Sequence, residues 1–350
     1  MKLFEFDTLP GVYSMTTFHT LAREGIEAFS LVSPETPIIS VGYFQDASLE
    51  IDLDYCVQKN LPVFRREIGG GGVYLDRNQI FYHVILRRDN PLASRRISDL
   101  YEMLSIPPIE TYRELGIETK FRPVNDIVTS DSERKISGEG AGDIGPCVVF
   151  VGSIMLDFDY DTMARVIRVP DEKFRDKIHK SIKDNVTTVF KETGKRPSRQ
   201  EIREILKRKF SAILGKFEEA ELTNELIEQR KDITSKMMDP QFVFKRTMKK
   251  PGELRIRSGV EYILGIHKAP GGLIRTASEI KNSRLVDVSI SGDFTLLPIQ
   301  GLPKIENSLS GVERTKGEVA NRIERVISDE ELQVPGVSIE DFLLALKIEE

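Results

Sequence analysis

The sequence predicts an α+β protein built from two domains of unequal size and a helical connector. Residues 1–195 mix short β-branched strands with helices, residues 196–240 hold two charged helices, and strand patterns return over residues 241–350. At 350 residues the chain also exceeds the size at which single hydrophobic cores usually stop growing. We therefore expect two separate cores.

In the first domain, the apolar spacing predicts a helix over Met15–Phe29, and Asp52 is expected to cap a second helix that ends at Lys59. A helix over Asp161–Arg168 is expected near the end of the domain. Runs rich in β-branched and apolar residues, bounded by turn residues, predict the strands Pro37–Tyr43, Pro62–Arg66, Gln79–Leu86, Phe121–Thr129, Arg134–Ser137 and Cys147–Phe158.

The connector is expected to contain the helices Ser198–Leu214 and Glu218–Met237. Its basic cluster at 207–209 is best interpreted as a solvated helix face, because apolar residues keep a helical stripe beside it. In the second domain the predicted elements are the strands Leu254–Ile256, Gly259–His267, Gly272–Ile280 and Leu285–Ile290 and the helices Thr315–Ile327 and Ser338–Leu346.

Composition excludes several classes of protein. The net charge of -5 and the pI of about 5.7 disfavour a nucleic-acid binder. Cys56 and Cys147 form no metal-binding pattern and argue against a disulfide scaffold. No apolar run is long enough to span a bilayer, and the first residues lack the apolar stretch of a signal peptide. We expect a cytoplasmic protein that binds neither membrane nor nucleic acid.

Four consecutive glycines, Gly69 to Gly72, follow Arg65 and Arg66 between two predicted strands. Glycine lets a ligand approach the backbone closely, and successive N–H groups in such a loop can cradle an anion. Arginine presents a fork of donors that suits carboxylate and phosphate. The segment lacks the spacing of a P-loop or of a dinucleotide fingerprint. Two interpretations therefore stay open: a binding site for an acyl phosphate or nucleotide phosphate, and a simple flexible turn.

A second group of residues lies farther along the chain. Asn125 and Asp126 interrupt an apolar stretch, and Lys135 lies in the next predicted strand. A lysine in a short strand is usually a solvated surface residue. If the two strands form a hairpin, however, these three side chains converge on one cavity, where Asp126 would orient the lysine or bind magnesium.

These segments resemble the motifs of lipoate–protein ligases, within the biotinyl/lipoyl protein ligase family. The family pattern R-R-x-S-G-G-G-A-V-[FY]-H-D corresponds to residues 65–76, R-N-D-[LIV] to residues 124–127, K-[VI]-[SA]-G-S-A to residues 135–140, and H-G-T-L-L to residues 151–155. Residues 42–46 resemble the family's G-x-x-Q-[ND]. The segments 268–272 and 290–294 resemble its C-terminal accessory domain.

The resemblance implies a class II synthetase-like fold with a small α+β C-terminal domain. Residues 1–195 would be the catalytic domain for adenylation and transfer, residues 196–240 a helical connector that acts as a mobile hinge, and residues 241–350 the accessory domain. It also implies an ATP-dependent, AMP-forming ligase that joins lipoate to a lysine of another protein, through a lipoyl-AMP intermediate.

The resemblance assigns roles to individual residues. Lys135 would be the catalytic residue and would contact both lipoate and ATP. The remaining ATP or adenylate contacts would come from Arg66, Gly71, Gly72, Val73 and Tyr74, and the remaining lipoate contacts from Gly70, Gly138 and Val151. Asn125 and Asn78 would support the site, and Asp126 would hold magnesium.

The chain departs from the family pattern at several positions that border the expected site. Ile68 replaces a serine, Gly72 an alanine, Leu75 a histidine and Val151 a second histidine, while Glu139 and Gly140 replace Ser-Ala. These changes bear on which acyl group is accepted, lipoate or octanoate, more than on the chemistry.

Three alternatives share the fold. An octanoyltransferase needs an activated cysteine, yet neither Cys56 nor Cys147 occupies a nucleophile position of that family. A biotin–protein ligase usually carries G-R-G-R in place of the glycine run. A non-catalytic protein that binds lipoyl carriers would have lost adenylation. The expected partners are lipoic acid and a lipoyl carrier domain, such as a 2-oxoacid dehydrogenase E2 subunit or a glycine-cleavage H protein.

Overall fold

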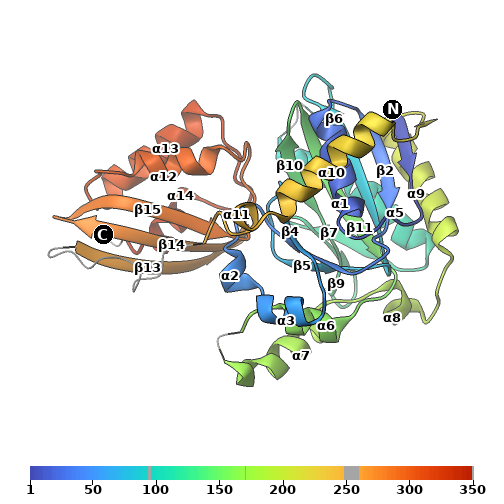
Figure 1. Ribbon diagram of the computed structural model, residues 1–350, viewed down its shortest axis with the longest axis horizontal. Helices are drawn as coiled ribbons and strands as arrows, with labels where there is room; N and C mark the ends of the chain where they lie inside the picture. Colours follow the sequence, from blue (N-terminus) through green and yellow to red (C-terminus); the bar gives the residue numbers. More distant parts are fainter. Residues whose placement is uncertain (94–95, 170, 248–259, 349–350) are drawn as a thin grey trace.

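The computed structural model describes residues 1–93, 96–169, 171–247 and 260–348. Figure 1 shows a larger N-terminal part on the right and a smaller C-terminal part on the left. The predicted strand Leu254–Ile256 lies outside the described residues. Within the described ranges, no helix combines the length and the apolar character needed to cross a membrane.

A six-stranded mixed sheet forms the centre of the larger part. Its strand order is β10-β11-β6-β2-β1-β12, with β1 parallel to both of its neighbours. Strand β6 is buried along almost its whole length because helices cover both faces of the sheet. The strands are β1 (Lys2–Glu5), β2 (Ala28–Val32), β6 (Gln79–Arg87), β10 (Gly140–Ile144), β11 (Cys147–Met155) and β12 (Glu218–Glu219).

Two hydrophobic cores fill the space between this sheet and its helices. Helices α1 (Tyr13–Arg23) and α10 (Asn224–Met238) supply Phe18 and Met237 to the core on one face. Helices α4 (Ile97–Leu104), α5 (Ile106–Glu114) and α9 (Arg199–Leu214) supply the core on the other. Hydroxyl groups inside α1 are satisfied locally, for example by the 3.0 Å bond from Thr20 Oγ1 to the carbonyl of Thr16.

The predicted connector is packed onto the larger part. Ile202, Leu206 and Phe210 of α9 are fully buried in the same core as the central sheet, and β12 extends that sheet beside β1. Thr16 of α1 and Thr234 of α10 are joined by a 2.7 Å hydrogen bond. The expectation of a mobile hinge over this segment does not fit such packing.

Two small sheets stand beside the central one. Strands β3 (Ile38–Val41), β4 (Val63–Arg65) and β5 (Val73–Leu75) form the first. Strands β7 (Thr119–Arg122), β8 (Asp126–Thr129) and β9 (Lys135–Gly138) form the second, which is antiparallel throughout. The short helices around them are α2 (Ala47–Glu50), α3 (Leu53–Gln58), α6 (Tyr160–Val166), α7 (Arg175–Asn185), α8 (Val189–Thr193) and α11 (Pro240–Val243), with a 3-10 turn at Glu172–Phe174.

Most predicted elements are observed, and three differ. The helix expected over Met15–Phe29 ends at Arg23, because Gly25 adopts the left-handed conformation and the chain then enters β2. The single strand expected over Phe121–Thr129 is the hairpin β7–β8. The helix expected from Glu218 begins at Asn224, since Thr223 accepts a hydrogen bond from the backbone N–H of Leu226 as its N-terminal cap.

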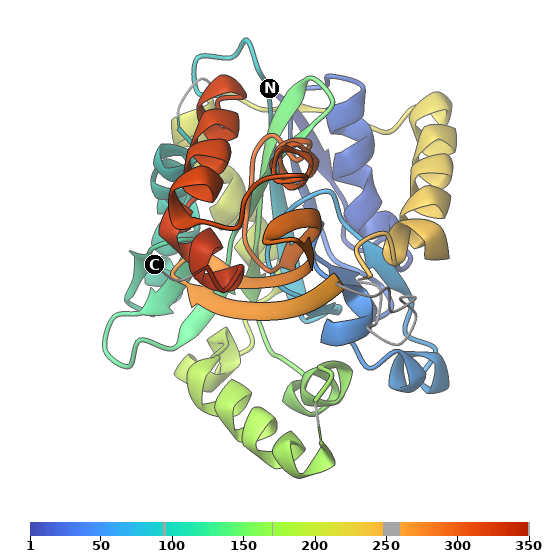
Figure 2. The same cartoon turned by 90° about the vertical axis from the view of Figure 1, so that its left-hand side faces the viewer.

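The C-terminal part is a three-stranded antiparallel sheet of β13 (Val260–Ala269), β14 (Gly272–Lys281) and β15 (Arg284–Gly292). Helices α12 (Gly301–Ser308), α13 (Lys316–Asp329) and α14 (Ile339–Ala345) lie together on one side of it, as Figures 1 and 2 show. Their apolar faces form a separate core that includes Phe294 and Phe342. This core is separate from the two that cover the faces of the central sheet.

Phe44 is a central contact between the two parts. Phe44 follows β3 in the larger part, yet it is fully buried in the C-terminal core and stacks on Phe294, with ring centroids 5.2 Å apart. The backbone N–H of Gly292 donates to the carbonyl of Phe44 at 2.9 Å. Arg275 and Glu50 add an ion pair at 3.0 Å. These contacts attach the C-terminal sheet to the edge of the β3 sheet.

Arg65, at the end of β4, fixes the segment that carries Phe44. Its guanidinium is fully buried and donates to the carbonyls of Gly42, Tyr43 and Gln45 at 2.7–2.9 Å. It also donates at 3.0 Å to Phe242 and Val243, at the end of α11. Burial lowers the pKa of Arg65 to about 10, so the group stays protonated near neutral pH.

We expect Arg65→Met to lower the free energy of unfolding by about 2–4 kcal/mol, because several buried carbonyls lose their donor together. Urea unfolding followed by circular dichroism measures the change. Arg87→Met is the matched control: Arg87 is exposed and pairs with exposed Asp89, so its loss should leave the free energy of unfolding nearly unchanged. Equal losses in the two variants would contradict the role given to Arg65.

Candidate active site

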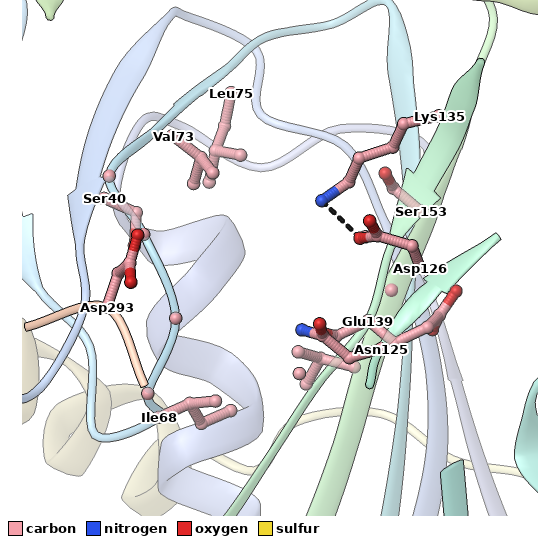
Figure 3. A pocket seen from close by; sticks show the side chains of 18 of the residues that line it. Ser40, Ile68, Val73, Leu75, Asn125, Asp126, Lys135, Glu139, Ser153 and Asp293 are labelled. Atoms are coloured by element: carbon pink, nitrogen blue, oxygen red, sulfur yellow. Dashed lines mark hydrogen bonds and ion pairs between the residues drawn. The ribbon is translucent and has the colours of Figure 1, made fainter. Parts of the chain in front are cut away.

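A cavity of about 630 Å³ opens between the glycine-rich segment and the β8–β9 hairpin. Figure 3 shows its two walls, with Lys135, Asp126 and Asn125 facing Ser40 and Asp293 across the space. All but one of the predicted site residues line it: Arg66, Gly70, Gly71, Gly72, Val73, Tyr74, Asn125, Asp126, Lys135, Gly138 and Val151. These residues come from four separate stretches of sequence, and the fold brings them together around one cavity.

Lys135 and Asp126 form the charged centre of one wall. Their Nζ and Oδ1 atoms lie 2.6 Å apart, and Arg122 contacts the other oxygen of Asp126 at 2.8 Å. Burial raises the pKa of Asp126, but the charges and hydrogen bonds of Lys135 and Arg122 outweigh it and hold that pKa below its usual value. The hairpin thus brings Asn125, Asp126 and Lys135 to one cavity, and Asp126 forms an ion pair with the lysine.

Asn125 holds the turn before β8 against the strand after Lys135. Its Nδ2 donates to the carbonyl of Glu139 at 2.6 Å, and the backbone N–H of Glu139 donates to the carbonyl of Asn125 at 2.7 Å. Asn78, by contrast, does not line the cavity. It lies in the turn before β6 and donates to the carboxylate of Asp76 from its backbone and its side chain.

Glu139 is a buried carboxyl group behind the same wall. It accepts hydrogen bonds from Tyr82 Oη at 2.7 Å and from Ser137 Oγ at 3.0 Å. Burial raises the pKa of Glu139 to about 8, against the lowering effect of these donors and of Lys135. A large fraction of Glu139 is therefore uncharged near neutral pH, which limits its repulsion of an anion bound at Lys135.

The opposite wall is the glycine loop, and Arg66 shapes it from within. Arg66 donates to the carbonyls of Gly69 and Gly71 at 2.7 and 2.8 Å, and to the carbonyl of Ser40 at 3.2 Å. Gly70 has a φ of +87°, a conformation that favours glycine. The arginine thus maintains a loop whose residues Gly70 to Gly72 face the cavity.

The C-terminal part also builds this site. A side chain at Gly69 would place its Cβ 2.6 Å from the carbonyl oxygen of Phe294, so the loop lies directly against the C-terminal chain. Lys268 and Asp293 line the cavity, together with Pro270, Gly271 and Gly272. Both segments were predicted only to belong to the accessory domain. Because they lie far along the chain from the other motifs, the sequence did not indicate that they line the site.

The inner part of the cavity is apolar. Ile68, Leu75 and Val151, three of the positions that depart from the family pattern, all line it. Ile68 is fully buried, and a Cβ added at Gly140 would lie about equally close to Ile68 and Val151, at 3.1 and 3.2 Å. Further apolar side chains complete this region: Met15, Phe18, Phe64, Phe81 and Met155. The departures therefore produce a hydrocarbon-like wall.

The two cysteines lie away from the cavity. Cys56 is buried in α3 and Cys147 in β11, and neither contributes to the lining. Burial raises the pKa of each thiol to about 11. Since the thiolate is the reactive form of cysteine, both thiols are poor nucleophiles.

A protein-built magnesium site is not found among the residues that the structure describes. Within those ranges, no three His, Cys, Asp or Glu side chains gather in a way that could hold a metal ion. Asp126 forms ion pairs with two cations, Lys135 and Arg122. Its role as a magnesium ligand stays a prediction.

Comparisons with known proteins agree with this architecture. The family described as the lipoyl protein ligase A/B catalytic domain matches residues 14–211. Lipoate-protein ligase A subunit 1 of Thermoplasma acidophilum is 30% identical over 159 residues, which cover 43% of this chain and 59% of that protein. Octanoyltransferase LipM of Kyrpidia tusciae is 24% identical over 233 residues, or 61% of this chain and 85% of the relative.

A solved structure of the bipartite lipoate protein ligase and its E2 lipoyl domain from T. acidophilum is 25% identical, with a TM-score of 0.61 over 73% of this chain and 98% of that chain. The family match covers more than half of the 350 residues, and the α+β fold resembles that of a solved lipoate protein ligase. This chain belongs to the lipoyl protein ligase A/B catalytic domain family.

Proposed function

We propose that this protein is an ATP-dependent, AMP-forming lipoate–protein ligase. The observation that supports the proposal best is the composition of its cavity, which presents Lys135 opposite the glycine loop and includes neither cysteine. A carboxylate and a nucleotide phosphate need compensating positive charge and exposed N–H groups, and the cavity offers both. An acyl-cysteine mechanism has no nucleophile there.

In the first step, lipoate and the magnesium complex of ATP are the substrates. A carboxylate oxygen of lipoate attacks the α-phosphorus, a new P–O bond forms, and pyrophosphate leaves. Lys135 exchanges Asp126 for the reacting anions and stabilises charge on both of them. The N–H groups of Gly71 and Gly72 bind the phosphates, and the apolar wall holds the acyl chain. The main contribution of the protein is positioning.

In the second step, the neutral amine of a lysine on a lipoyl carrier domain attacks the carbonyl carbon of lipoyl-AMP. An amide bond forms, the bond between the acyl carbon and the phosphate oxygen breaks, AMP leaves, and the amine gives up a proton to solvent. The half-exposed side chain of Lys135 indicates an open cavity mouth through which such a lysine can enter. The carrier is the partner class that we propose.

The rival functions remain testable against this one. An octanoyltransferase is favoured by the similarity to LipM, and the buried, unreactive thiols count against it. A non-catalytic carrier-binding protein would have no need for Lys135 in the cavity. A biotin–protein ligase would adenylate biotin. Exchange of pyrophosphate into ATP, measured with lipoate, octanoate and biotin in turn, separates these functions.

We expect Lys135→Ala to lower lipoate-dependent ATP–pyrophosphate exchange by about 10²–10³-fold, because the positive charge at the reacting anions is lost. Lys120→Ala is the matched control, since Lys120 lies in β7 of the same three-stranded sheet, pairs with exposed Glu133 and lies outside the cavity. Thermal unfolding checks that both variants fold. A folded Lys135→Ala protein that forms lipoyl-AMP at a near-normal rate would contradict the proposed mechanism.

Replacing Cys56 and Cys147 together by alanine should leave ligation of lipoate within about three-fold of the unmodified protein, because no covalent step involves a thiol. Mass spectrometry of the unmodified protein after incubation with an octanoylated carrier provides the complementary test. A thioester on either cysteine, together with loss of activity in the double variant, would identify a transferase instead.

A chain that ends at Thr247 should adenylate poorly and still transfer lipoate from supplied lipoyl-AMP. It keeps Phe242 and Val243, on which Arg65 depends, and removes Phe294, Lys268 and Asp293 from the site. Truncation exposes Phe44, which is otherwise buried in the C-terminal core. The substitution Phe44→Ser should therefore be combined with the truncation to prevent aggregation. The two half-reactions are measured separately in a truncated protein shown to be folded. Full adenylation would rule out a role of the C-terminal part in the first step.

A further inference from the structure

His83 occupies the inner, apolar end of the cavity. It lies in β6, opposite Ser30 of β2 and Val151 of β11 in the sheet register. Its side chain is 1% exposed and lines the cavity with Phe18, Phe81 and Met15. The polar imidazole ring is therefore surrounded by apolar side chains and has almost no contact with solvent.

The two ring nitrogens of His83 differ in their surroundings. Nδ1 lies 2.8 Å from Ser30 Oγ, whereas Nε2 is buried and has no hydrogen-bond partner among the described residues. His19, the neighbouring buried histidine, contrasts with it. The nitrogens of His19 lie 2.9 Å from the carbonyl of Met15 and 3.2 Å from the backbone N–H of Glu67. Phe18 contacts both histidine rings, and of the two only His83 has a buried nitrogen without a hydrogen-bond partner among the described residues.

The imidazole of His83 is uncharged. Burial lowers its pKa to about 3, with a further contribution from His19. The hydroxyl of Ser30 can either donate to Nδ1 or accept from it, so Nε2 can carry a proton or a lone pair. A buried polar atom without a partner is unfavourable, and a ligand atom that contacts it recovers the lost interaction.

The acid substrate spans this cavity from one end to the other. Its carboxylate belongs beside Lys135, and its hydrocarbon chain belongs against Ile68, Leu75 and Val151. Lipoate and octanoate share the carboxylate and a carbon chain of equal length, and they differ at the far end, where lipoate carries two ring sulfurs. Sulfur is polarisable, accepts weak hydrogen bonds and packs well against aromatic rings such as Phe18.

We propose that His83 forms a distal subsite that contacts the dithiolane sulfurs and selects lipoate over octanoate. The inference rests on the proposed function and adds the residue that determines acyl specificity. Phe18, whose ring centroid lies 4.5 Å from that of His83, closes the subsite from the side of α1. The hydrocarbon end of octanoate would leave Nε2 of His83 without a partner. His83 therefore disfavours the binding of octanoate as well as favouring the binding of lipoate.

The test is the binding of each acid alone, by titration calorimetry without ATP. His83→Leu should weaken lipoate binding about five- to ten-fold relative to octanoate, because the leucine offers no polar contact. His83→Gln, which keeps a polar group, should retain part of the preference. His179→Leu makes the same chemical change on α7, outside the cavity, and should change neither affinity.

Nitrogen NMR of histidine-labelled unmodified protein gives a second readout that needs no variant. Lipoate should shift the Nε2 resonance of His83 more than octanoate does. An unchanged ratio of affinities in both His83 variants, or equal shifts with the two acids, would overturn the inference while lipoate-dependent pyrophosphate exchange still supports the ligase. Absence of that exchange in the unmodified protein would instead overturn the proposed function.

Discussion

The buried guanidinium of Arg65 is the interaction on which the rest of the structure depends. It gathers the carbonyls of Gly42, Tyr43 and Gln45, and those of two residues at the end of α11, around a single charge. This arrangement directs Phe44 into the C-terminal core. It also fixes the start of the glycine loop, because Arg66 is the next residue. Two arginines that are adjacent in sequence thus have separate tasks, one inside the protein and one at the site.

The cavity is divided between charge and hydrocarbon. Lys135, Asp126 and Arg122 supply its charged lining, whereas Ile68, Leu75 and Val151 supply apolar lining. Glu139 lies between these regions as a carboxyl group that is largely uncharged near neutral pH. Such a distribution suits a substrate with an anionic end and an apolar body. The positions that depart from the family pattern, such as Ile68 and Val151, belong to the apolar lining. The ion pair of Lys135 with Asp126 therefore does not depend on them.

The sequence predicted the local elements well, since strands such as β6 and caps such as Asp52 depend on neighbouring residues. It also located Lys135 and the glycine loop through their motifs, and the fold and family were confirmed. The contributions of Lys268, Asp293 and His83 to the cavity could not be predicted, because they arise from tertiary packing between distant segments. The packing of α9 was missed for the same reason: its apolar stripe was recognised, but its partner surface was not.

The contact between the glycine loop and Phe294 has a consequence for how the enzyme matures. Gly69 and Phe294 belong to opposite ends of the sequence, so the loop gains its support only after the last strand of the C-terminal sheet has formed. Domains generally fold as units in the order of their synthesis, and the N-terminal part emerges from the ribosome first. A nascent chain therefore acquires the cores around its central sheet before its glycine loop is supported by the C-terminal part. The cavity is complete only after that part has been made.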